Sequence, residues 1–255
     1  MEDNVVTIQP IDPDELDKVV GKDVETGDVV VDLTELDKDV ESVVLPLEAV
    51  QQILDAAKES GNDTEALVIK LPEVIVELDD KTMHVITDTV EGDVALSVNL
   101  IEVEDLNTDQ KQALKDKKTF GGIDISLVCT ATGEKVTDFE GGKVTMKVPF
   151  EVPANHKANG FSVWHVAEDG KLTKMTTKYE DGHLVFGTGH FSDYIIIYEE
   201  PAPEGNQPGG SGSGSTGNDG PSKTGDTAMP AAFILLATMS ITALTVISLG
   251  KKKFF

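Results

Sequence analysis

Two stretches, "IDISLVC" at residues 123–129 and "KVTMKVPFEV" at residues 143–152, alternate apolar and polar side chains. The apolar members of the first stretch fall on one face: Ile123, Ile125, Leu127 and Cys129. Those of the second stretch do the same: Val144, Met146, Val148 and Phe150. A period of two residues is typical of strands with one buried face. Both stretches therefore predict half-buried β-strands.

Other short β-branched runs extend this pattern over most of the chain. They cover residues 29–33, 66–71, 74–78, 83–87, 93–103, 160–175 and 183–200. The run at 160–175 contains Asp169 and Gly170, a pair that favours a tight turn between two antiparallel strands. Many short strands separated by turn residues predict an α+β, mainly β domain, with an antiparallel β-sandwich-like arrangement.

Two segments have helical spacing instead. In "LEAVQQILDAAKES", residues 47–60, apolar residues recur every three or four positions, with Pro46 at the start and Gly61 as the stop. "NTDQKQALKD", residues 107–116, predicts a brief helix capped by Asn107 or Thr108. We therefore expect one or two short helices.

The charge balance excludes one class of partner. The chain has a formal charge of -25, and its 21 basic residues are all lysine. Nucleic-acid binding depends on clustered basic side chains, and arginine is the side chain best suited to phosphate. We therefore expect no nucleic-acid partner and a solvated acidic surface. Cys129 is the single cysteine, so an intrachain disulfide is impossible.

Composition divides the chain into four segments. Residues 1–28 read as an acidic lead-in or the end of a preceding module, and residues 29–199 as the β-rich module. Residues 200–223 are rich in Gly, Ser and Pro, which favours a flexible linker, and residues 224–255 form the tail. No signal-peptide pattern follows Met1, so we expect either a removed leader or, preferably, a piece of a longer surface protein.

The tail has the composition of a membrane anchor. Residues 227–250 carry no charge, and about 20 apolar residues suffice to cross a bilayer. Lys251, Lys252 and Lys253 follow directly, and clustered lysines stay on the cytoplasmic side. The pattern predicts a transmembrane segment with the module outside the cell. The alternative is a buried core helix, for which a lysine stop has no purpose.

A polar motif precedes that span: Lys223, Thr224, Gly225 and Asp226. A small polar motif, an apolar stretch and a short basic end together resemble the cell-wall sorting signal of Gram-positive bacteria, in a form similar to that of clostridia-like Firmicutes. The resemblance implies that a sortase cleaves between Thr224 and Gly225 and transfers the protein to peptidoglycan. The chain departs from the usual Leu-Pro-x-Thr-Gly pattern, because Pro221 lies three residues before Thr224 and Gly220 precedes it. A tail that is never cleaved is the alternative.

The last predicted strand opens with His190, Phe191 and Ser192. His-Phe-Ser resembles the motif at which certain nucleoporins and death-domain proteins cut their own chain, the serine attacking the preceding carbonyl. It also closes uncut β-sandwich modules of ankyrins and netrin receptors, and roughly residues 29–198 resemble a module of Firmicutes surface proteins that ends in His-Phe-Ser-x-Tyr. We interpret His190 and Ser192 as structural, with Phe191 or Tyr194 packed inward. Self-cleavage between Phe191 and Ser192 is the alternative.

A calcium site is the weaker interpretation of a second motif. Asp105, Asn107 and Asp109 alternate like the start of a calcium loop, but Gln110 occupies the position where glycine is needed. The pattern favours a helix cap, so we expect no metal and no cofactor.

These features together predict a non-enzymatic cell-surface protein, anchored at its C-terminus to the cell wall or the cytoplasmic membrane. Its expected partners are sortase, peptidoglycan and the membrane. Its role would be structural display or spacing, or adhesion to a ligand on a host or neighbouring cell.

Overall fold

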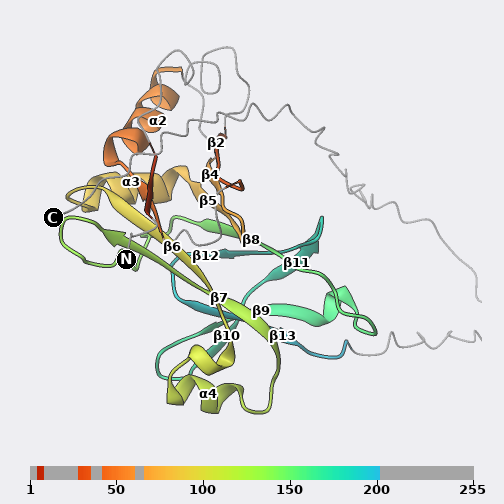
Figure 1. Ribbon diagram of the computed structural model, residues 1–255. Coiled ribbons are helices and arrows are strands. Elements are labelled where there is room, and N and C mark those ends of the chain that lie inside the picture. The colour runs from red at the N-terminus through yellow and green to blue at the C-terminus, as the bar shows by residue number, and fades with distance from the viewer. Residues whose placement is uncertain (1–4, 9–27, 36–41, 61–65, 202–255) are drawn as a thin grey trace, which may run out of the picture. The chain divides into compact units, whose positions relative to one another are not determined.

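The computed structural model describes residues 5–8, 28–35, 42–60 and 66–201 (Figure 1). These residues belong to one compact unit. The predicted linker beyond Pro201, the Lys-Thr-Gly-Asp motif, the predicted membrane span at 227–250 and the lysines after it all lie outside the described residues.

The described strands form two sheets. The first sheet has seven strands, in the order β1 (Val5–Thr7), β3 (Ser42–Leu45), β6 (Val94–Ile101), β7 (Lys118–Cys129), β13 (Asp193–Tyr198), β9 (Phe161–Val166) and β10 (Leu172–Lys174). The second sheet has six, in the order β11 (Thr177–Glu180), β12 (His183–Thr188), β8 (Val144–Pro149), β5 (Ile75–Asp79), β4 (Ala66–Lys70) and β2 (Val29–Asp32). The prediction of an α+β, mainly β domain is confirmed.

The predicted antiparallel pairing is found for most of the described strand pairs, but two pairs differ from it. β1 pairs with β3 in parallel, and β2 pairs with β4 in parallel, whereas the other described pairs are antiparallel. Parallel partners require a crossover connection, and between β2 and β4 the chain passes through β3 and the helix α2 (Leu47–Ser60). Both sheets are therefore mixed.

One core joins the two sheets. The predicted buried face of β7 is confirmed, since Ile123, Ile125, Leu127 and Cys129 are each less than 5% exposed. The first three of these side chains belong to the same apolar cluster as side chains of β4, β5, β8 and β12 in the second sheet. On β8 the predicted face is also buried, and Phe150 just beyond it is half-buried.

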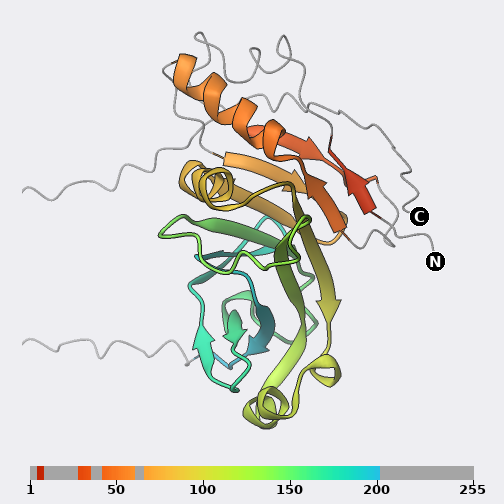
Figure 2. The same cartoon turned by 90° about the vertical axis from the view of Figure 1, so that its left-hand side faces the viewer.

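Two predicted helices are confirmed. α2 buries Val50, Ile53, Leu54 and Ala57, the side chains at helical spacing. The helix α4 (Thr108–Leu114) begins after Asn107, whose side-chain oxygen accepts hydrogen bonds from the backbone N–H groups of the helix's first turn. Figure 1 and Figure 2 show β6 and β7 running from the region of α2 and α3 toward α4.

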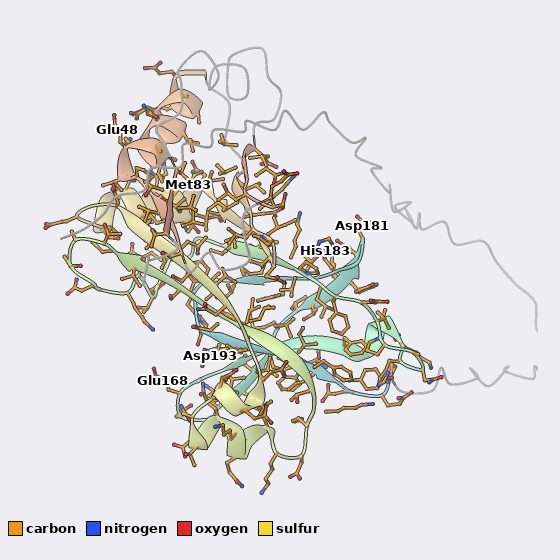
Figure 3. All side chains as sticks on the ribbon, viewed as in Figure 1. Glu48, Met83, Glu168, Asp181, His183 and Asp193 are labelled. Carbon is orange, nitrogen blue, oxygen red and sulfur yellow. The ribbon has the colours of Figure 1, made fainter. Side chains whose placement is uncertain are left out.

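The strand predicted at residues 83–87 is wrong. These residues lie in the helix α3 (Asp80–Thr89), which makes three α-helices in the described part, not one or two. Asp79 caps α3 by accepting a 2.8 Å hydrogen bond from the Thr82 N–H. Met83 and Ile86, one turn apart, are both fully buried, so a helix packs this segment better than a strand does. Figure 3 labels Met83 among the crowded side chains near α2.

The first sheet extends into the range predicted as a lead-in. β1 adds to its edge, and Ile8, just after β1, is 6% exposed and part of the core. Residues 5–8 therefore fold with the module.

No helix within the described ranges is both long and apolar enough to cross a membrane.

Candidate functional site at the closing strand

The turn between β12 and β13 carries the predicted His-Phe-Ser motif and is held by a group of hydroxyls. The His190 carbonyl accepts hydrogen bonds from the Thr188 hydroxyl and the Tyr194 hydroxyl, each at 2.7 Å. The two hydroxyl oxygens also lie 2.7 Å apart. Tyr194 is fully buried, and burial raises the pKa of its phenol to about 12 although the Thr188 contact opposes that shift. The phenol therefore stays neutral and can donate.

Phe191 and Tyr194 both pack inward. Phe191 is 9% exposed and meets Phe139 edge to face, with ring centroids 4.9 Å apart and an interplanar angle of 77°. The loop that carries Phe139 is tied to the same turn, because the Phe139 N–H donates to the Gly189 carbonyl at 3.2 Å. Residues 189–191 are thus anchored by backbone and by side chains.

Ser192 contacts a histidine that the motif does not contain. Its Oγ lies 3.1 Å from Nε2 of His165, which comes from β9. The contact follows from strand register, because His165 is the cross-strand partner of Tyr194 in the β9–β13 pair. The hydrogen-bond partner of the Ser192 hydroxyl is therefore His165.

The surroundings of His165 favour its neutral form. Burial lowers the pKa of its imidazole, and the neighbouring His190 lowers it further, while Asp193 and Asp169 oppose the shift. The ring centroids of His165 and His190 lie 4.6 Å apart, and the two ring planes meet at 64°. When neutral His165 carries its proton on Nδ1, its Nε2 accepts a hydrogen bond from the Ser192 hydroxyl.

A serine hydrogen-bonded to a neutral histidine is the pair of residues found in activated serine nucleophiles, where the histidine acts as the base. The carbonyl that precedes Ser192 in the sequence is that of Phe191, so attack on it would form an ester with Ser192. Such a shift needs backbone strain to proceed. Non-glycine residues with left-handed φ in the described part are Glu140, Asn155 and Asp181, all outside the motif. The arrangement serves equally as a structural hydrogen bond.

Sequence reasoning found Ser192 and His190 but not the pairing with His165. Ser192 and His165 are 27 residues apart, and only the register of β9 against β13 brings them together. The single signal in the sequence was a histidine at an inward position of an apolar strand.

Two of the three side chains considered for calcium, Asp105 and Asn107, cap helices. An Asp105 carboxylate oxygen accepts from the Glu102 N–H, and the Asn107 oxygen accepts from the N–H groups of Asp109 and Gln110. In the ranges that the structure describes, no three His, Cys, Asp or Glu side chains stand close enough to share a metal ion.

One apolar cavity is too small for an organic ligand. It lies between α2 and both sheets, is lined by side chains such as Ile8, Val31 and Val50, and has a volume of about 10 Å³.

Lys223, Thr224, Gly225, Asp226 and the lysines at 251–253 lie outside the described residues. No protein-family model, curated protein or solved structure matches the chain.

Proposed function

We propose that this chain is a non-enzymatic cell-surface protein that a sortase attaches to peptidoglycan through Thr224. The observation that carries the proposal is the order of three sequence features. A Lys-Thr-Gly-Asp motif at 223–226 is followed by an uncharged span at 227–250, and the lysines at 251–253 come directly after that span. A span of this length fits a bilayer, and the lysines orient it with the module outside the cell.

The fold supports a tethered module. β13 is the last described strand, and it is bonded on both sides, to β7 and to β9. A tether that leaves from such a strand pulls on two ladders of hydrogen bonds instead of one edge. We infer that the two sheets form a β-sandwich-like surface module of the kind that suits display.

The segment after the module sets its reach. Taken as a flexible coil, the Gly, Ser and Pro-rich residues 200–223 span about 25–30 Å root-mean-square. This distance is short compared with a thick cell wall. Attachment to the wall itself, or further modules upstream, then brings the module to the outer surface. The role we propose is display or spacing, with adhesion to a host or neighbouring cell as the variant in which the module itself binds.

A reporter fusion tests the anchoring. Residues 200–255 are joined to a secreted reporter enzyme in a sortase-containing Gram-positive host, and wall and membrane fractions are separated. We expect reporter in the fraction released by muramidase. The Thr224→Ala fusion should stay in the detergent-extracted membrane, and Thr227→Ala is the matched control that should behave like the parent. Membrane retention of all three fusions would contradict wall attachment and leave a membrane anchor that is never cleaved.

The 3.1 Å contact between Ser192 Oγ and His165 Nε2 favours a second candidate, self-cleavage between Phe191 and Ser192. The Ser192 hydroxyl would attack the Phe191 carbonyl while His165 takes its proton. The bond from that carbonyl carbon to the Ser192 nitrogen would then break, with the proton passed from His165 to the nitrogen, which leaves as an amine. Water would then hydrolyse the resulting ester. Two fragments on a denaturing gel, lost in Ser192→Ala and in His165→Gln but kept in His183→Gln, would support it. A single full-length band after long incubation would exclude it.

A further inference from the structure

A row of polar side chains crosses the first sheet on the face that α4 covers. Asp124 of β7 lies directly opposite Asp193 of β13, and on its other side opposite Asn99 of β6. Alternation along β13 puts Asp193 on the same face as Ile195 and Ile197, which pack against Leu106 and Leu114 at α4. Figure 3 labels Asp193 near α4.

Asp193 is also the point to which α4 is fastened. Gln110, in α4, is 2% exposed, and its Nε2 donates to Asp193 Oδ2 at 2.7 Å and to the Val166 carbonyl at 3.0 Å. Its Oε1 accepts from the Asn107 N–H at the helix cap. The Asp193 carboxylate therefore takes part in holding the helix, the closing strand and β9 together.

The pairing of Asp124 with Asp193 is unfavourable when both are charged. Like charges directly opposite in a sheet destabilise it, and Asp124 is half-buried, so water screens it poorly. Burial raises the pKa of the Asp124 carboxyl, and the negative charge of Asp193 raises it further. The Asn99 hydrogen bond and the charge of Lys135 oppose this shift. The negative charge of Asp193 also acts on His165 of β9, where it opposes the lowering of the imidazole pKa.

We propose that Asp124 and Asp193 form a proton-operated latch, which closes in mild acid and strengthens the attachment of β13 and α4 to the sheet. When Asp124 is protonated, its hydroxyl donates to the Asp193 carboxylate, which keeps its bond from Gln110. When Asp124 is ionised, the two carboxylates repel across the β7–β13 pair. The inference concerns the response of the module to acid and does not depend on how the chain is anchored.

The direction of the effect follows from linkage. The folded state binds the Asp124 proton at a higher pH than the unfolded state, so this pair adds stability as the pH falls through the raised folded pKa. That gain is complete below the unfolded pKa of about 4, and it is lost as the pH rises. Between the two pKa values the unfolding equilibrium constant changes by up to about tenfold for each pH unit.

Asp124→Asn tests the latch, because asparagine resembles the protonated acid. Thermal unfolding of the full chain is compared from pH 4 to pH 8 with Asp116→Asn as the control, since Asp116 is exposed and stands apart from the row. We expect Asp124→Asn to melt roughly 2–4 °C above the parent at pH 7 and to lose that advantage in acid. Asp116→Asn should run parallel to the parent.

Two results overturn the latch. One is a difference between Asp124→Asn and the parent that is constant with pH, and the other is a variant less stable than the parent at pH 7. Should the variant fail to fold, the carboxyl carbon of Asp124 in the unmodified protein can be titrated by NMR. A midpoint above that of Asp116, with hydrogen exchange in α4 slowing as the pH falls, supports the latch. A midpoint equal to that of Asp116 overturns it.

Discussion

Replacing Tyr194 by phenylalanine removes one hydroxyl from the turn that closes the module and leaves its ring in place. That hydroxyl contacts the His190 carbonyl and the Thr188 hydroxyl, both at 2.7 Å. A typical hydrogen bond contributes about 0.5–1.5 kcal/mol net. The carbonyl keeps its bond from Thr188, so no buried acceptor is orphaned. We expect Tyr194→Phe to lower the free energy of unfolding by about 1–2 kcal/mol and the melting temperature by about 3–6 °C.

Tyr179→Phe is the matched control. Tyr179 is 37% exposed, and its hydroxyl donates to the Phe150 carbonyl at 3.2 Å. Its loss should cost less than about 0.5 kcal/mol, as exposed substitutions usually do. Urea unfolding, followed through the fluorescence of the single tryptophan, Trp164, measures both variants. An equal midpoint shift in the two variants, with unchanged slopes, would refute a stabilising role for the hydroxyl group at this turn.

Three further substitutions probe other parts of the module. A Cβ at Gly142 would lie 2.5 Å from the Thr82 hydroxyl oxygen, so Gly142→Ala should cost about 1–3 kcal/mol in urea unfolding, and a neutral result would contradict this close packing. The Thr82 hydroxyl is buried with no hydrogen-bond partner in the described part, so Thr82→Val should raise the melting temperature, whereas a lower one would reveal a hidden partner. The hydrogen bond from Lys174 holds the pKa of Glu199 below its ordinary value, and Lys117 lies 3.7 Å away. That contribution is present above the unfolded pKa and is lost as the pH falls through the folded one, so Glu199→Gln should destabilise at pH 7 and not near pH 3; an equal loss at both pH values would count against the ion pair.

Elements marked by a local sequence signal, such as regular alternation or a helix cap, could be predicted from the sequence. Strict alternation in residues 123–129 placed one face of β7 in the core, and Asn107 marked the start of α4. Both signals are local, and tertiary contacts agree with them. The prediction of the mainly β class rested on many such short segments.

Residues 83–87 show where local pattern fails. Their β-branched side chains favoured a strand, but Asp79 lies four residues before Met83, and its carboxylate caps a helix that buries Met83 and Ile86. The strand prediction rested on β-propensity alone, which is the weaker signal when packing decides.

Contacts that depend on strand register could not be predicted from the sequence. The parallel pairing of β1 with β3, the contact between Ser192 and His165 and the pairing of Asp124 with Asp193 each join segments far apart in the chain. A one-residue slip of β13, for example, would move Asp193 to the other face of the sheet, away from Asp124. No single-sequence pattern specifies that register.

Mass spectrometry of the C-terminal peptide is the most direct test of wall anchoring. Native protein is released from cells by muramidase, and its last peptide is sequenced. Sortase attachment predicts a peptide that ends at Thr224 and carries a peptidoglycan fragment. A peptide that continues through Gly225 to Phe255, recovered by detergent and not by muramidase, would contradict it.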